Sequence, residues 1–143
     1  MESIVNKENI LEYIPQRPPM VMVDTLISST LKSATSGFKI REDNIFLKKD
    51  QIDSPGLIEN IAQTAAASAG FHFKKNKLPV KVGFIGSIKK LQIHAWPTIG
   101  DELMTTIEEV NEVMNVKIIE GRISCNGKVI ASCEMKIFLM ETP

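Results

Sequence analysis

The chain has 143 residues, of which 43% are hydrophobic and 24% are charged, and its 17 basic residues balance its 17 acidic ones. A chain of this size can bury a core without disulfides or metals. The balanced charge gives neither the electrostatic footprint of a nucleic-acid-binding protein nor the signature of a disordered tail. We therefore expect one domain over residues 1–143 that binds no nucleic acid.

The sequence shows neither a membrane-spanning segment nor a signal peptide. No apolar run is long enough to span a bilayer, and the start, MESIVNKENI, lacks the charged-then-apolar order of a signal peptide. We expect a cytoplasmic protein with no membrane span.

Cys125 and Cys133 flank an Asn126-Gly127 turn. Such a turn would pair Cys125 with Lys128 and Glu120 with Cys133, so the two thiols should not face each other. We expect both to be reduced and buried. The sequence has no CxxC or HExxH pattern, and we predict neither a metal site nor a cofactor.

The first forty residues predict a short helix and two strands. Asn6 is a possible cap for a helix that Pro15 would stop. The β-branched stretch over residues 20–40 indicates two strands or one bent hairpin, with the first strand beginning directly after Gln16.

One long helix is predicted over residues 54–73, because this stretch is rich in helix formers and begins with Ser-Pro-Gly. Apolar residues recur in it at helical spacing, while Ala66, Ala67 and Ser68 occupy most of what would be the solvent face. The helix should be buried nearly all round.

Strands are predicted for everything after Pro79, over residues 80–96, 101–110, 115–125 and 128–140. In the last of these, apolar residues alternate with polar ones, which is typical of an antiparallel strand with one core face. The core positions are Val129, Ala131, Cys133, Met135, Ile137 and Leu139. One apolar helix and one long curved sheet predict an α+β fold in which the sheet wraps the helix.

Glu59 is the candidate catalytic residue that the pattern itself singles out. It is a lone carboxylate near the start of a helix built to be buried. A glutamate in the first turn is also favoured by the helix dipole, which requires no function. Gln63 lies four residues on, hence on the same face, where it can hydrogen-bond to the carboxylate and orient it.

Three motifs occur in the order IPQRPPMVMVD, LIENIAQTAA and VGFIGSIKKLQIHAWPTIGDEL. Together they resemble the 3-hydroxyacyl-acyl-carrier-protein dehydratases of the hotdog fold over nearly the whole chain, and most of all the branch associated with aryl-polyene and flexirubin-type pigments. The resemblance implies a curved antiparallel sheet around one central helix. It also implies a dimer formed by two sheets joined edge to edge, with each active site drawing on both subunits.

The resemblance assigns roles to residues on the helix. Glu59 would protonate the departing 3-hydroxyl group, with Gln63 in support. The backbone N–H groups of Gly56 and Leu57 would hold the thioester carbonyl. The candidate substrate-binding residues from the third motif are Phe84, Ile85 and Gly86, although aromatic and branched residues on strands more often belong to the core.

Gln16 stands where the family's loop motif, Leu-Pro-His-Arg-x-Pro, has the histidine that would remove the proton next to the carbonyl. An amide can bind and orient a substrate but is essentially non-basic. The family's His-Phe-Pro-Gly segment before the helix is also replaced, by IFLKKDQIDSPG. Neither remaining histidine is a good substitute, because His72 lies roughly 20 Å from Glu59 along the helix and His94 is expected at the surface or half-buried.

The sequence therefore predicts a dehydratase-like enzyme acting on an acyl chain linked through phosphopantetheine to acyl carrier protein, as a homodimer or as a heterodimer with another hotdog protein. Two alternatives stay open: a non-catalytic acyl-carrier-binding or partner subunit, and an acyl thioesterase. Lys74, Lys75 and Lys77 either complement the helix C-terminus or form a landing site for the carrier.

Overall fold

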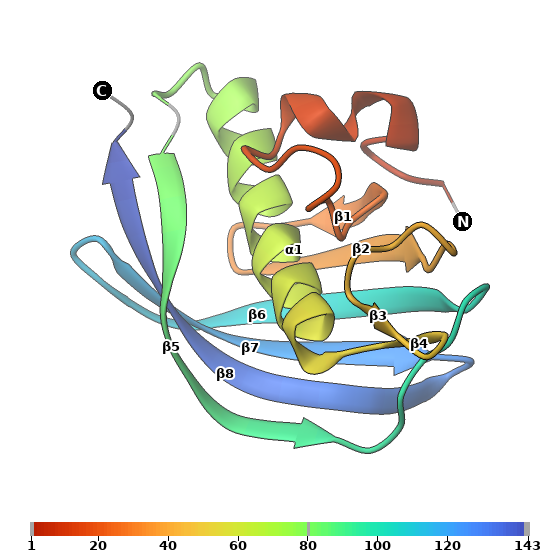
Figure 1. Ribbon diagram of the computed structural model, residues 1–143. Coiled ribbons are helices and arrows are strands. Elements are labelled where there is room, and N and C mark those ends of the chain that lie inside the picture. Colours follow the sequence, from red (N-terminus) through yellow and green to blue (C-terminus); the bar gives the residue numbers. More distant parts are fainter. Residues whose placement is uncertain (1, 80, 142–143) are drawn as a thin grey trace.

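The structure is a computed structural model that describes residues 2–79 and 81–141 (Figure 1). Its elements, in chain order, are the 3₁₀ helix η1 (Lys7–Glu12), the strands β1 (Thr25–Ser29), β2 (Ser33–Lys39), β3 (Leu47–Lys48) and β4 (Gln51–Ile52), the helix α1 (Ser54–Lys75), and the strands β5 (Lys81–Ile93), β6 (Glu102–Val113), β7 (Val116–Cys125) and β8 (Lys128–Glu141).

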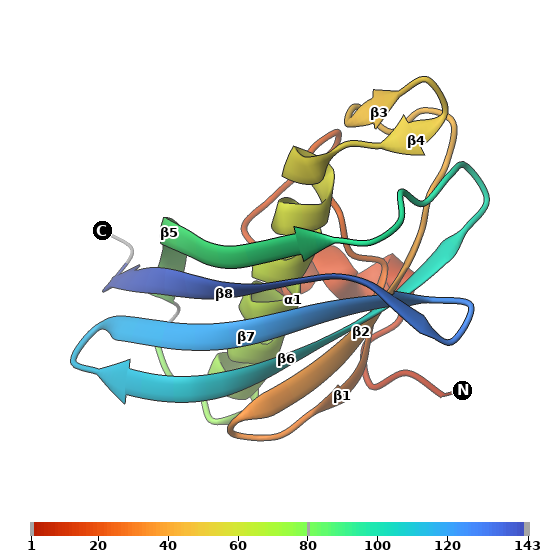
Figure 2. The same ribbon diagram turned by 90° about the horizontal axis from the view of Figure 1, so that it is seen from below.

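Six strands form one antiparallel sheet in the order β1-β2-β6-β7-β8-β5, and β3 and β4 form a separate small hairpin. The large sheet curves around α1, which lies against its concave face, as Figures 1 and 2 show from two sides. The α+β architecture predicted from the sequence is confirmed. β5 and β1 are the two edge strands of the large sheet.

The helix α1 begins at Ser54 because Asp53 caps it, its Oδ1 accepting a hydrogen bond of 2.8 Å from the Ser54 N–H, and because Pro55 suits the first turn. It ends at Asn76, whose N–H donates to the carbonyl of His72. Every residue over 56–73 is buried or half-buried, which confirms the expectation of a helix with almost no solvent face.

The central contact between helix and sheet is made by Ile61 and Gly121. Ile61 is 1% exposed, and a Cβ added at Gly121 in β7 would collide with its side chain. The missing side chain lets α1 approach the sheet closely. Gly70 plays the corresponding part on another side of the helix, where an added Cβ would strike the carbonyl of Tyr13 in the segment after η1.

The first strand and a small hairpin differ from the sequence prediction. The first strand begins at Thr25 rather than directly after Gln16. Between them the chain makes a turn in which the Met20 N–H donates to the Arg17 carbonyl, and the two prolines inside it have no N–H to give to a sheet. The hairpin of β3 and β4 was not predicted, because each strand has only two residues. Val80, where a predicted strand began, lies outside the described residues.

The hairpin of β7 and β8 departs from regular alternation at a bulge. Cys125 pairs with Lys128 as predicted, but the register then slips, so Cys133 faces Gly121 rather than Glu120. Ile130 is the inserted residue, and its carbonyl accepts the His94 N–H at 2.7 Å. The slip turns Val129 outward, where it is 45% exposed, and the prediction that it belongs to the core is wrong.

Both cysteines are free and buried, as predicted. Burial raises the pKa of the Cys133 thiol to about 11, so it carries little thiolate at neutral pH. No helix in the described part of the chain has the length and apolar character needed to cross a membrane.

We predict that Gly121→Ala destabilises the protein by about 1–3 kcal/mol, because the new methyl group overpacks the contact with Ile61. Ile61→Ala, by contrast, should open a cavity and cost about 2–5 kcal/mol. Urea unfolding measures both free energies. The double variant should lose clearly less stability than the two single losses added together, since the new methyl group then fills vacated space. Strict additivity would show that the two residues do not limit the approach of α1 to the sheet.

Candidate active site

A cavity of about 1080 Å³ lies along α1, between the helix, the segment after η1 and the inner side of the large sheet. The helix lines it with one stripe of residues, Glu59, Ala62, Ala65, Ala66, Ala69 and Phe73. Gln16 lines the same cavity from the loop that follows η1. The two residues that the sequence selected as catalytic candidates, 43 positions apart, therefore line one cavity.

Gln63 holds Glu59 and the loop in one network. The Nε2 of Gln63 donates to Glu59 Oε2 at 2.9 Å and to the carbonyl of Met20 at 2.9 Å, while its Oε1 accepts the Met22 N–H at 2.6 Å. Gln63 is 0% exposed. The hydrogen bond predicted between Gln63 and Glu59 is present, and the same amide fixes the backbone that leads back to Gln16.

Asn60, one turn before Gln63, is a second buried tether that sequence reasoning missed. Its Nδ2 donates to the carbonyl of Met22 at 2.7 Å, and its Oδ1 accepts a hydrogen bond from the Thr105 hydroxyl in β6. Both side chains are 0% exposed. The available signal was an uncharged polar residue inside an apolar helix, since such a group is buried only when it is hydrogen-bonded.

Gln16 carries an unsatisfied polar atom. Its Oε1 is buried and has no hydrogen-bond partner among the described residues. The loop around it is fixed, because the Arg17 guanidinium donates to the carbonyls of Ile14 at 2.8 Å and Gln16 at 2.7 Å. A buried acceptor without a donor is costly, so this oxygen marks a place where a ligand, a water or a partner subunit completes the site.

The helix start is arranged differently from the prediction. Gly56 and Leu57 are buried and do not line the cavity, and their N–H groups donate to the Asp53 carbonyl at 3.0 and 3.3 Å. Neither N–H is turned to a substrate in this conformation, so their role at the thioester carbonyl stays a prediction.

Of the three candidate substrate-binding residues on β5, two line the cavity and one does not. Phe84 and Ile85 line the cavity. Gly86 does not, and a Cβ added there would strike the ring of Phe138 in β8. Substrate binding by these residues stays a prediction. The side chains of Phe84 and Ile85 can reach a substrate in the cavity.

The two histidines lie away from Glu59. His72 lines the far end of the cavity, where its Nε2 is 2.9 Å from both the Ser29 hydroxyl and the Thr30 carbonyl. His94 is exposed and does not line the cavity. Among the described residues no cluster of three or more His, Cys, Asp or Glu side chains is placed to hold a metal ion.

Comparison with known families shows which family the chain belongs to. The profile of the ApeP-like family, described as ApeP dehydratase, matches residues 8–142. The chain belongs to the ApeP-like dehydratase family. It is 26% identical, over 147 aligned residues, to the 3-hydroxyacyl-[acyl-carrier-protein] dehydratase FabZ of Helicobacter pylori, and this alignment covers 94% of the chain and 90% of the relative.

Solved structures establish the fold. The dehydratase heterocomplex ApeI:P from Xenorhabdus doucetiae superposes with a TM-score of 0.85 at 21% identity, covering 94% of this chain and 91% of that one. A hypothetical thioesterase protein from Streptococcus pneumoniae, solved with coenzyme A, superposes with a TM-score of 0.64 at 10% identity, covering 82% and 85%. This ApeP-like protein has the hotdog fold.

We predict that Gln63→Met lowers the stability of this ApeP-like protein by at least about 1–3 kcal/mol, because it leaves the buried Met22 N–H without an acceptor. Glu59→Gln should change stability much less, since an amide oxygen can still accept from Gln63. Thermal or urea unfolding compares the two. Equal losses for both variants would mean that Gln63 serves only Glu59 and does not anchor the loop.

Proposed function

We propose that this ApeP-like protein is a 3-hydroxyacyl-[acyl-carrier-protein] dehydratase-like lyase, acting in fatty-acid synthesis or in the synthesis of a polyene-type lipid or pigment. The observation that carries the proposal is the Glu59 carboxylate, held by the buried Gln63 at the wall of a cavity of about 1080 Å³. Membership of a dehydratase family supports it, and so does the likeness to FabZ.

The reaction removes a proton from C2 of the acyl chain and breaks the bond between C3 and its hydroxyl oxygen, releasing one water. In our proposal Glu59, in its protonated form, gives its proton to that hydroxyl group as it leaves. Gln63 fixes the carboxyl group by donating to Oε2, so that the other oxygen is available to the substrate. General acid catalysis of this kind typically contributes about 10²–10⁴-fold.

The proposed mechanism also needs a base to remove the C2 proton, and this chain has no histidine at the family's position. Gln16 cannot remove a proton, but its unpartnered Oε1 can accept a hydrogen bond from a substrate group or from a water beside Glu59. A base supplied by a second hotdog subunit is therefore the second candidate arrangement, in which this chain contributes Glu59 to a mixed site or serves as a non-catalytic carrier-binding subunit. It is supported by the heterocomplex to which this fold is similar.

We predict a dimer formed through β5. This edge strand of 13 residues carries exposed apolar side chains, Phe84, Ile85, Ile88 and Leu91, and a long unprotected edge of this kind promotes pairing. Sedimentation should find a dimer at micromolar concentration, which Ile85→Lys/Ile88→Lys converts to monomer. Met114→Lys is the control, since Met114 is 90% exposed at the β6–β7 hairpin. A monomeric wild-type chain would contradict the shared site.

We predict that Glu59→Gln lowers the hydration or dehydration turnover of a 3-hydroxyacyl thioester by about 10²–10⁴-fold with the fold intact, because an amide has no proton to give at neutral pH. Circular dichroism and the unfolding midpoint control for folding. Full activity in this variant would remove Glu59 from the mechanism. Thioester hydrolysis without dehydration would favour the thioesterase alternative.

Restoring histidine at Gln16 tests whether the missing base limits the isolated chain. Gln16→His should raise turnover by up to about 10²–10⁴-fold if the rest of the machinery is complete. The comparison needs the same homodimer for both proteins, because a second hotdog subunit can bring a base of its own. No gain, with dimerisation unchanged, would favour the mixed-dimer arrangement.

A further inference from the structure

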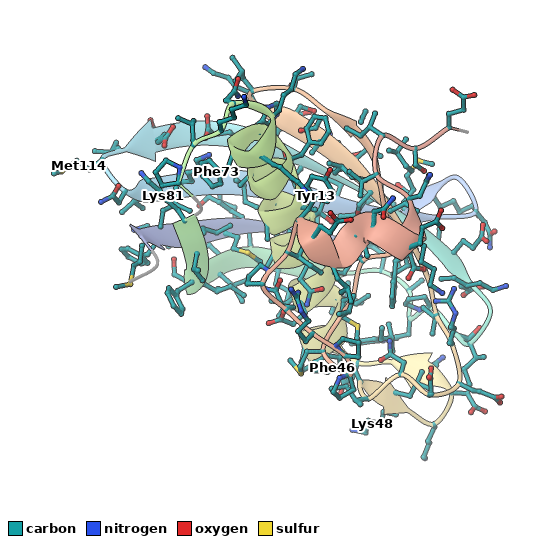
Figure 3. The ribbon with its side chains drawn as sticks, turned by 90° about the horizontal axis from the view of Figure 1, so that it is seen from above. Tyr13, Phe46, Lys48, Phe73, Lys81 and Met114 are labelled. Atoms are coloured by element: carbon teal, nitrogen blue, oxygen red, sulfur yellow. The ribbon has the colours of Figure 1, made fainter. Side chains whose placement is uncertain are left out.

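The cavity opens to solvent at the C-terminal end of α1, at the far end from Glu59. The exposed residues that line it there are Glu12, Leu31, Lys32, Lys74, Lys77 and Leu78. Figure 3 looks onto this end, with Phe73 and Lys81 labelled on one side of the helix and Tyr13 on the other. The opening therefore combines apolar side chains with three lysines and one glutamate, from η1, the β1–β2 turn, the end of α1 and the segment that follows it.

The charge at this opening is positive after its ion pairs are counted. Lys74 is paired with Glu12 at 2.9 Å, and Lys117 is paired with Glu109 at 3.5 Å. Over residues 2–79 and 81–140, Lys32 and Lys77 enter no ion pair. These two lysines are available to an acidic partner.

The negative pole of α1 explains a lysine at its C-terminus without any partner. It does not explain Lys32, which lies in the β1–β2 turn and is exposed at the same opening. Leu31 beside it is 84% exposed, and Leu78 is 54% exposed. Two apolar side chains among unpaired cations are complementary to an amphipathic surface of opposite charge.

The distance from this opening to the catalytic candidate suits a carrier's arm. Lys74 lies 15 residues after Glu59, which corresponds to about 22 Å along the helix axis. The covalent path from the phosphate of a phosphopantetheine arm to C3 of its acyl chain is comparable to about five residues of extended peptide, roughly 18 Å. Along this path the helix presents the alanine stripe of Ala62, Ala65, Ala66 and Ala69, whose methyl groups leave room beside α1.

Exposed residues also line the cavity on the β5 side, at Phe84 and Ile85, and in the loop after η1, at Pro15 and Arg17. In the dimer proposed above the β5 edge is covered by the second subunit. The lysine-lined opening stays free in that dimer as a route by which a tethered substrate reaches Glu59.

We propose that the opening at the C-terminal end of α1 is the docking surface for an acidic acyl carrier protein. Lys32 and Lys77 contact the phosphate of the arm and the carrier's carboxylates, Leu31 and Leu78 contact its apolar side chains, and the arm lies along the alanine stripe. This inference rests on the proposed function, because it assumes that the thioester must reach Glu59.

The test measures the affinity of the intact protein for an acidic acyl carrier protein bearing its phosphopantetheine arm, by calorimetric titration. Lys32→Gln/Lys77→Gln should weaken binding about three- to thirtyfold, as expected for the loss of two exposed charge contacts. Lys48→Gln/Lys49→Gln, in the β3–β4 hairpin and away from both this opening and the β5 edge, is the matched control and should change affinity less than twofold. Each pair removes two exposed positive charges and includes one lysine with positive φ, 54° at Lys77 and 52° at Lys49.

Salt and substrate choice sharpen the result. The difference between the two variants should shrink at high salt, where exposed charges are screened. For turnover, Lys32→Gln/Lys77→Gln should raise KM more for the carrier-linked substrate than for a short thioester without phosphate. If the wild-type homodimer turns over neither substrate, catalysis by the isolated chain fails, and the titration still decides the docking surface.

Three outcomes would overturn the docking surface. They are equal weakening by the two double variants, stronger weakening by Lys48→Gln/Lys49→Gln, and binding to vesicles of anionic lipid without any binding to the carrier. The last would assign the same leucines and lysines to a membrane surface.

Discussion

The buried amide of Gln63 is the interaction on which the geometry of the site depends. One side chain, with no solvent exposure, donates to the Glu59 carboxylate and the Met20 carbonyl and accepts the Met22 N–H. An irregular loop has few backbone partners of its own, and unpaired groups at this depth would cost about 1–3 kcal/mol each. The same bonds that satisfy the loop also fix the carboxylate. Stability and the placement of the Glu59 carboxylate are therefore coupled through one residue, and Asn60 strengthens the coupling by holding the Met22 carbonyl.

The single chain leaves two features of its site incomplete. The Gln16 amide oxygen is buried without a partner, and the β5 edge beside the cavity exposes Phe84 and Ile85. Both are unfavourable for an isolated protein, one through an unmade hydrogen bond and the other through apolar surface in water. A second subunit against β5 would relieve the second, and a substrate, water or subunit group in the cavity would relieve the first. An assembly or a ligand that covered both features would recover the free energy that they cost the monomer.

The fold and the place of Glu59 beside the cavity were accessible to sequence reasoning because each has a local signature. The alternation in β8, the uninterrupted helix formers of α1 and the isolation of Glu59 are visible in short windows, and Gln63 follows from helical spacing alone. The rest depends on tertiary context. The bulge at Ile130 turns Val129 outward, although the alternating pattern places it in the core. The N–H groups of Gly56 and Leu57 donate to the carbonyl of Asp53, the N-cap residue, which lies one position before the Ser-Pro-Gly stretch. Met20 and Met22 bind the helix through their backbone groups, which every residue type shares. Their side chains therefore could not have predicted this contact.

The alanine stripe shows how the helix accommodates two opposing demands. One face of α1 must pack closely on the sheet, which Ile61 and Gly121 achieve, while the face toward the cavity must leave space. Alanine meets the second demand with the highest helix propensity and no side-chain entropy to lose, so the helix stays well formed where it has little to pack against. Larger apolar residues there would bury more surface and fill the cavity. Glu59, the one carboxylate of α1, lies in the second turn and the lysines lie in the last, so the length of α1 separates the proposed chemistry from the proposed recognition of a partner.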